Sequence, residues 1–142
     1  MYRPEGILAA MATPMTEDEK INEKELRNQV NRMIKAGVHG LFCLGTNGEF
    51  YALSMEEKLE VIRIVVDENK GRLPVCAGTG CITTAETIYL SRKAQELGVD
   101  AVSIISPYFV AVSQDELYNH YKEIAESIDI PIILYNIPMR TG

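Results

Sequence analysis

The segment KAGVHGLFCL, residues 35–44, decides the fold because the chain nearly repeats it later. ELGVDAVSII, residues 96–105, has the same order of features: the end of a helical pattern, a glycine, a valine, a short polar turn and an apolar run. Gly37 and Gly98 stand where a helix commonly ends in the left-handed conformation. A nearly all-apolar run is typical of a strand covered on both faces. Both segments therefore predict a helix that leads into a parallel strand.

The same alternation extends along the whole chain. Apolar runs predict five strands, at residues 7–12, 40–44, 74–77, 101–105 and 131–135. Their starts recur about every 30 residues, which is the size of one βα unit. The pattern predicts an α/β fold with a parallel sheet.

Helical patterns fill the segments between the strands. Two of them place apolar residues on one helical face. These residues are Leu26, Val30, Met33 and Ile34 in the first pattern, and Leu117, Tyr121, Ile124 and Ala125 in the last. Ser54 with Glu57, and Ser113 with Glu116, have the spacing of a capping box and predict two helix starts.

Composition limits the kind of partner. The 142 residues suffice for one compact domain or a piece of a larger one, and 46% are hydrophobic. The 14 basic and 20 acidic residues give a net charge of −6 without a basic run, which disfavours nucleic acid and anionic membrane surfaces. No apolar stretch approaches the ~20 residues of a membrane span, and no signal peptide is apparent. We expect a cytoplasmic protein.

The three cysteines do not predict a disulfide framework, because their number is odd. Cys43 and Cys76 lie inside apolar runs and are expected to be small buried residues. Cys76 and Cys81 lie close together, but no histidine or further cysteine supports a metal site. His39 and His120 are expected to be solvent-exposed or locally hydrogen-bonded.

Two architectures accept this pattern of elements. A five-stranded doubly wound sheet fits 142 residues, and length alone favours it. A (β/α)8 barrel needs about 250 residues, so five strands would be part of one. In both architectures, ligands bind beyond the carboxyl ends of the strands. The segments there are ATPMT, GTNGEF, AGTGC, SPYF and YNIPMRTG.

Three of these segments carry candidate site residues. The two glycines of GTNGEF, residues 45–50, allow backbone N–H groups to approach a small anion, although a plain tight turn explains them equally well. AGTGC is weaker evidence for a binding site, since G-x-G without a third glycine is a common βα turn. Tyr135 ends a strand, where its hydroxyl could relay protons or simply cap the core. Arg140 follows it, suited to a substrate carboxylate or to a surface ion pair.

The same segments disfavour the known doubly wound sites. A phosphoacceptor domain needs acidic residues after the first and third strands, where this chain reads AAMAT and CAGTG. The acidic TPMTEDEK would repel the phosphate of a flavin. The dinucleotide fingerprint G-x-G-x-x-G is absent from the first βα turn.

Taken together, GTNGE and YNIPMRTG resemble the pyruvate-dependent class I aldolase family of dihydrodipicolinate synthase and N-acetylneuraminate lyase. The similarity extends through TP, AGTG and PY after the other strands. The resemblance implies a (β/α)8 TIM barrel, of which residues 1–142 would form the amino-terminal part with about the first five βα units. It also implies a homo-oligomer, usually a tetramer, and no metal or organic cofactor.

The resemblance also implies a lyase chemistry. Pyruvate forms a Schiff base with a lysine, and the resulting enamine attacks an aldehyde; lyases run the reverse. Thr46 and the backbone at Asn47 would hold the pyruvate carboxylate. Tyr135 would relay protons, and Arg140 would bind the carboxyl group of the second substrate.

Three departures from the family pattern stand out. Asn47 occupies a place where the family often has threonine, and Phe109 a place where synthases typically have a tyrosine that reaches across the dimer. All seven lysines fall on predicted helices or their flanks. They are Lys20, Lys24, Lys35, Lys58, Lys70, Lys93 and Lys122. The Schiff-base lysine of the family would lie beyond Gly142, so we expect the chain alone to be catalytically incomplete.

The leading hypothesis is a dihydrodipicolinate synthase-like enzyme of lysine biosynthesis, which condenses pyruvate with aspartate semialdehyde. Arg140 favours this activity. Phe109 and GTNGEF favour the alternative, a 2-keto-3-deoxy sugar acid or N-acetylneuraminate aldolase. Two further alternatives are a non-catalytic half-barrel interaction module and a small carboxylate-binding module.

Overall fold

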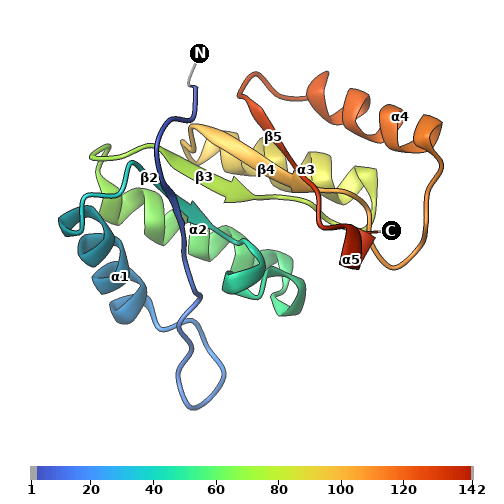
Figure 1. The fold of residues 1–142 in the computed structure, drawn as a ribbon. Coiled ribbons are helices and arrows are strands. Elements are labelled where there is room, and N and C mark those ends of the chain that lie inside the picture. Colours follow the sequence, from blue (N-terminus) through green and yellow to red (C-terminus); the bar gives the residue numbers. More distant parts are fainter. Residues whose placement is uncertain (1–2, 142) are drawn as a thin grey trace.

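The computed structural model describes residues 3–141 and contains five strands that alternate with helices (Figure 1). All five predicted strands are confirmed, with ends that lie within two residues of the expected ones. They are β1 (Leu8–Ala10), β2 (Gly40–Cys43), β3 (Val75–Gly78), β4 (Ala101–Ile105) and β5 (Ile132–Tyr135).

The helices begin and end where the local sequence indicates. They are α1 (Glu23–Lys35), α2 (Met55–Asn69), α3 (Thr84–Glu96), α4 (Gln114–Ala125) and the short α5 (Pro138–Thr141), with 3-10 turns η1 (Thr46–Gly48) and η2 (Phe50–Ala52). Ser54 and Ser113 both form the expected capping boxes. Gly37 and Gly98 have φ angles of 78° and 92°, which confirms their left-handed conformation after α1 and α3.

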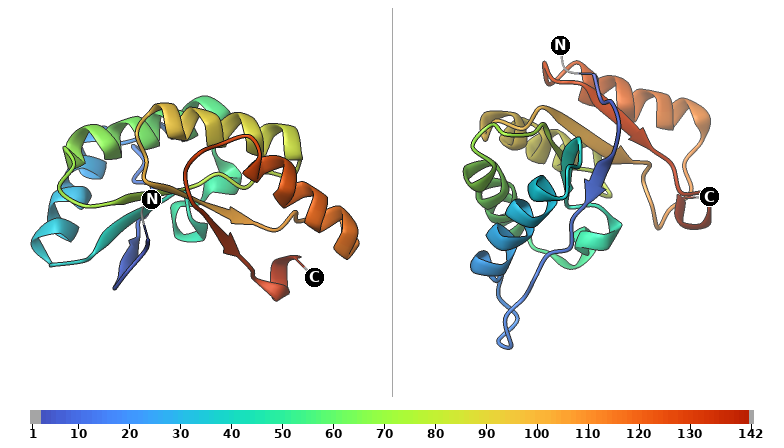
Figure 2. Two further views of the ribbon diagram at one scale, coloured as in Figure 1. Left: turned by 90° about the horizontal axis from the view of Figure 1, so that it is seen from above. Right: turned by 60° about the vertical axis from the view of Figure 1, so that its left-hand side comes forward.

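The strands are parallel and follow the order β1-β2-β3-β4-β5. The sheet is curved, and the four long helices lie on its outer side (Figures 1 and 2). The doubly wound alternative that length favoured is therefore wrong. A doubly wound sheet reverses its strand order and carries helices on both faces, whereas successive right-handed crossovers in one direction place every helix on one face. The chain has the architecture of a partial (β/α)8 barrel.

The core lies between the sheet and the helices. Its fully buried side chains include Leu26, Val30, Leu41, Ile62, Ile64, Leu90, Ile104 and Ile124. Every residue of β3 and β4 is buried, whereas β1 and β5 contain no fully buried residue. Ala125, which the periodicity places on the apolar face of the last helical pattern, is exposed, because α4 packs mainly against α3 and its other flank faces solvent.

The cysteines behave as small buried residues. Cys43 and Cys76 are each 1% exposed, and Cys81 is also a buried free thiol. Burial raises the pKa of the Cys43 and Cys76 thiols to about 12, which leaves them protonated and unreactive. Among residues 3–141, no helix combines the length and apolar character needed to cross a bilayer.

The prediction for the two histidines holds for the exposed His39 and is wrong for His120, which is buried and bonds to a neighbouring helix. His39 is exposed, and its Nδ1 accepts a bond of 3.0 Å from the backbone N–H of Ile7. His120 is only 6% exposed, and its Nδ1 lies 2.9 Å from Oγ1 of Thr84 on α3. Within the described part of the chain, Nε2 of His120 has no hydrogen-bond partner.

Candidate active site

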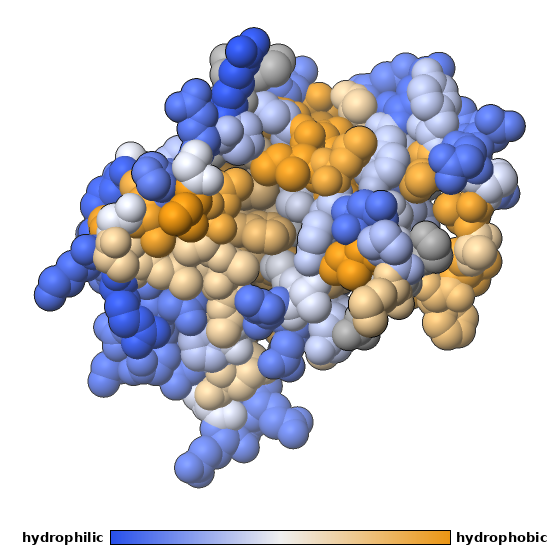
Figure 3. Space-filling view, viewed as in Figure 1, coloured by the Kyte–Doolittle hydropathy of each residue, from blue (hydrophilic) through white to orange (hydrophobic). Residues whose placement is uncertain are grey.

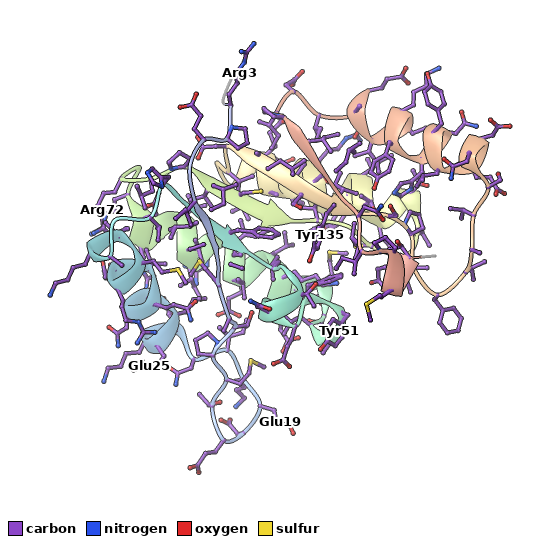
Figure 4. All side chains as sticks on the ribbon, in the orientation of Figure 1. Arg3, Glu19, Glu25, Tyr51, Arg72 and Tyr135 are labelled. Atoms are coloured by element: carbon purple, nitrogen blue, oxygen red, sulfur yellow. The ribbon has the colours of Figure 1, made fainter. Side chains whose placement is uncertain are left out.

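The carboxyl ends of β2 and β5 bring two hydroxyl groups together. Oγ1 of Thr46 lies 3.3 Å from Oη of Tyr135, although 89 positions separate the two residues in the chain. Tyr135 pairs with Ile105 of β4, and its ring is nearly perpendicular to that of Phe42 of β2, at a centroid distance of 6.5 Å. Figure 4 shows the Tyr135 side chain over the inner face of the sheet. A hydroxyl pair at this rim is able to pass a proton between its members.

The turn after β2 positions Thr46, and its first residue, Leu44, has an unfavourable backbone conformation. Leu44 is buried and has a φ of 57°, in the left-handed region that a leucine rarely adopts. Thr46 then begins the 3-10 turn, in which the N–H of Gly48 donates to the carbonyl of Gly45 at 2.9 Å. The first N–H groups of such a turn have no partner inside it. Among residues 3–141, the backbone N–H groups of Thr46 and Asn47 have no hydrogen-bond partner, an arrangement that suits a small anion.

The AGTGC turn, expected to be an ordinary βα turn, contains two glycines that have no room for a side chain. A Cβ atom on Gly78 would lie 2.1 Å from the carbonyl oxygen of Leu44, and a Cβ atom on Gly80 would lie 2.8 Å from the backbone nitrogen of Ile105. Both positions therefore require glycine. The turn packs its backbone directly against the segment that carries Thr46.

A cavity of about 270 Å³ opens at the same rim. It is lined by Thr46, Phe50, Tyr51, Ile105, Tyr108, Phe109 and Ile137. Its walls are mostly apolar, and partial burial raises the pKa of the Tyr108 hydroxyl, so this group stays protonated. A smaller hollow of about 10 Å³ lies deeper, where Tyr135 and the buried Ser103 contribute to its lining. The cavity is open to solvent on the side of Tyr51 and Phe109, and its volume is that of a small-molecule site.

The remaining residues that the sequence singled out are Asn47, Arg140 and Phe109. Asn47 is exposed next to Thr46. Arg140 lies on α5, but its side chain falls outside the part of the chain that the structure describes. Phe109 is 93% exposed and has a φ of 79°. The structure thus brings Thr46, Asn47 and Tyr135 to one rim.

The seven lysines lie away from the strands, as expected. Lys24, Lys35, Lys58, Lys93 and Lys122 are on helices, Lys70 caps α2, and Lys20 lies in the loop before α1. All seven are exposed or partly exposed. No group of three or more His, Cys, Asp or Glu residues within 3–141 has an arrangement suited to a metal ion.

Sequence reasoning missed several residues of the cavity wall. Tyr51, Ile105 and Ile137 line the cavity but have no distinctive motif. Ile105 ends β4 and Ile137 closely follows β5, and this position is the signal that could have identified them, because side chains there face the mouth of a barrel. Tyr51 lies in η2, well after the end of β2, and had no such signal. The left-handed Leu44 had no signal, since nothing in its type favours that conformation.

Known proteins share both this fold and this arrangement of segments. The model of the dihydrodipicolinate synthetase family matches residues 3–142. A 4-hydroxy-tetrahydrodipicolinate synthase of Methanopyrus kandleri is 46% identical over 99% of this chain and 47% of its own length. The relative from Pelobacter propionicus with the same name is 45% identical over 96% of this chain and 47% of its own length.

Solved structures agree with the sequence matches. A dihydrodipicolinate synthase from Acinetobacter baumannii in complex with pyruvate superposes with a TM-score of 0.94 and 42% identity, over 96% of this chain and 47% of the other. An N-acetylneuraminate lyase from Mycoplasma synoviae gives a TM-score of 0.88 and 38% identity, over 94% and 46% of the two chains. The chain spans about half the length of the curated relatives it matches. It belongs to the dihydrodipicolinate synthetase family.

Proposed function

We propose that residues 1–142 form the amino-terminal part of a (β/α)8 barrel enzyme that activates pyruvate as a Schiff base and joins it to an aldehyde. The leading activity is condensation of pyruvate with aspartate semialdehyde, as in a dihydrodipicolinate synthase. The observation that carries the proposal is the pair of hydroxyl groups of Thr46 and Tyr135, 3.3 Å apart at the rim where barrel enzymes bind substrates. The names of the relatives support the same activity.

The roles of the residues follow from their chemistry. Thr46 and the N–H of Asn47 would hold the pyruvate carboxylate, since hydroxyl and amide donors bind carboxylate oxygens. Formation of an imine requires proton transfers to and from a carbinolamine, and the phenol of Tyr135 would supply them through Thr46. Arg140 would bind the carboxyl group of the second substrate. The attacking lysine would lie on a later strand, because none of the seven lysines here lies on a strand.

Trapping with borohydride tests this proposal. Reduction in the presence of pyruvate should leave a stable adduct on one lysine of the full-length protein, detected by intact mass and peptide mapping. The isolated 142-residue chain should remain unmodified under the same conditions. A full-length protein without an adduct would contradict the proposed chemistry, and an adduct on the short chain would show that its nucleophile is one of the seven lysines.

The second substrate has one alternative, a 2-keto-3-deoxy sugar acid or N-acetylneuraminate. Two observations favour it: the N-acetylneuraminate lyase among the structural relatives, and Phe109 at a place where synthases typically have a tyrosine. Rates with aspartate semialdehyde and with sugar acids separate the two activities. Arg140→Ser should weaken use of aspartate semialdehyde far more than use of a neutral aldehyde.

We also propose a cytoplasmic homo-oligomer. Large apolar side chains are exposed at the rim of the cavity: Tyr51 at 61%, Phe109 at 93% and Val110 at 62%. Such exposure is typical of surfaces that another protein covers. Three free, buried thiols fit a reducing compartment. Light scattering of the full-length protein should give a multiple of the monomer mass, and Phe109→Asp should lower it.

The non-catalytic half-barrel remains the second class of function. It is supported by the side chains exposed on the two outer strands and beside them, Ile7 at 63% and Leu134 at 65%, and by the apolar surface visible in Figure 3. In that case the 142-residue chain itself would be the native product and would form a dimer of defined mass. The mass of the native product decides between the two classes.

A further inference from the structure

Three buried hydroxyl residues fix the turn between β3 and α3. Thr79, Thr87 and Ser91 are each fully buried. The hydroxyl of Ser91 on α3 donates to Oγ1 of Thr79 at 2.8 Å, and the N–H of Thr79 donates to the carbonyl of Ser103 on β4 at 3.0 Å. The N–H of Cys81 donates to Oγ1 of Thr87 at 3.0 Å. The turn is therefore held both by the helix behind it and by the neighbouring strand.

This turn presses on the backbone that precedes Thr46. The site of a Cβ atom on Gly78 lies 2.1 Å from the carbonyl oxygen of Leu44 and 3.5 Å from the nitrogen of Gly45. The peptide bond between Leu44 and Gly45 therefore rests directly on the backbone of Gly78. No side chain separates the two segments.

Leu44 needs such support, because its left-handed conformation is unfavourable for a residue with a Cβ atom. Conformations of this kind persist where the surrounding structure leaves no room for another. Leu44 is 1% exposed, and only Gly45 separates it from Thr46. Its backbone therefore determines where the Thr46 hydroxyl lies relative to Tyr135.

We propose that Thr79 and Ser91 are positioning residues for Thr46. The hydroxyl of Ser91 fixes Thr79, Thr79 fixes the backbone of Gly78, and Gly78 holds Leu44 in the conformation that directs Thr46 toward Tyr135. Neither residue touches the substrate. The inference rests on the proposed function, because it assigns Thr46 to the pyruvate site.

A double-mutant cycle in the full-length protein tests the coupling. Thr79→Val removes the hydroxyl and keeps the shape of the side chain, whereas Thr79→Ser keeps a hydroxyl. Thr79→Val should lower kcat/KM for pyruvate about tenfold, since small displacements of a site residue are costly. Thr79→Ser should recover most of that loss. In a Thr46→Val background, Thr79→Val should change kcat/KM by less than about twofold, because its effect passes through Thr46.

A matched control separates positioning from a general effect on folding. Thr84→Val removes a hydroxyl from α3, the helix that also carries Ser91. The Thr84 hydroxyl bonds to His120 of α4 at 2.9 Å and not to the turn after β3. The kcat/KM of this variant should stay within about twofold of the wild type. Ser91→Ala serves in place of Thr79→Val if the valine variant does not fold, with the same expected loss and the same dependence on Thr46.

The outcomes distinguish this inference from the proposed function. If Thr79→Val causes the same loss whether or not Thr46→Val is also present, the positioning role is overturned. A wild-type protein without a borohydride adduct would overturn the proposed function instead. Crystal structures then decide the inference without activity: in Thr79→Val the Thr46–Tyr135 hydrogen bond should be lost. An unchanged bond would overturn the inference.

Discussion

The central and the outer strands of this sheet differ in how they are covered. All residues of β3 and β4 are buried, while β1 and β5 have none that is fully buried within the described chain. Thr46 follows β2 and is held through the tightly packed turn after β3, whereas Tyr135 ends the outer strand β5. The candidate site therefore joins a closely packed part of the molecule to a loosely covered part. Stability and chemistry should respond differently to changes in the two.

The largest effect is expected at the closest backbone contact of the central part. Gly78→Ala would place a methyl group 2.1 Å from the carbonyl oxygen of Leu44, and backbone cannot move aside as a side chain can. We expect a loss of more than about 3 kcal/mol in the free energy of unfolding, measured by urea denaturation. Gly37→Ala is the matched control: its φ is 78°, but the added Cβ atom would meet no described residue within 4 Å other than its chain neighbours. It should lose about 1 kcal/mol of unfolding free energy. Similar losses would contradict the packing argument.

A pair of leucines compares the central and outer strands directly. Leu41 of β2 is 0% exposed and Leu134 of β5 is 65% exposed. Leu41→Ala should lower the free energy of unfolding by about 3 kcal/mol through lost burial and a cavity. Leu134→Ala should lower it by less than about 1 kcal/mol. If the two variants unfold at the same urea concentration, β5 is better covered in solution than the described contacts indicate.

The hydroxyl of Tyr135 should matter for chemistry and little for stability. Tyr135→Phe keeps the ring against Phe42 and removes only the bond to Thr46. In the full-length protein we expect kcat to fall about 100-fold, with the dissociation constant for pyruvate nearly unchanged. Steady-state kinetics and thermal unfolding measure the two effects. Unchanged turnover would remove Tyr135 from the proton relay.

The smallest effect concerns pH and the contact between α3 and α4. Burial lowers the pKa of His120 from its usual value, and Glu123 only partly opposes this. The imidazole of the unfolded chain binds a proton more readily than the buried imidazole, so protonation favours the unfolded state. The contribution of neutral His120 to the free energy of unfolding is therefore complete above the pKa of the unfolded chain, about 6.5, and is lost as pH falls from there through the lower pKa of the folded state.

Urea denaturation of the wild type and of His120→Gln, at several values between about pH 5 and pH 8, checks this prediction. The wild type should lose stability toward acid more steeply than the variant. Thr84 and Tyr121 also contact the ring, and neither carries a charge in this range. Parallel pH profiles of the two proteins would contradict the prediction, because they would show that protonation of His120 does not change the free energy of unfolding.

Local signals in the sequence predicted the fold, but they predicted the candidate site only in part. Apolar runs, capping serines and the glycines at 37 and 98 each depend on neighbours in sequence, so they located the elements correctly. The meeting of Thr46 and Tyr135 was expected because parallel strands share one carboxyl rim. The bond from Ser91 to Thr79 and the contact of Gly78 with Leu44 were not foreseen, since both arise only when the chain is folded. The burial of His120 depends on how α4 lies against α3, which no local pattern encodes.

The order of the strands in the sheet has a consequence for how the chain acquires its structure. Each strand from β2 to β5 pairs with the strand that was synthesised just before it. The neighbour with which each new strand pairs has thus already been synthesised, and no strand must wait for a distant partner on that side. The sheet can grow at one edge as the ribosome releases it, and the two hydroxyl groups of the rim can meet once β5 has joined the sheet.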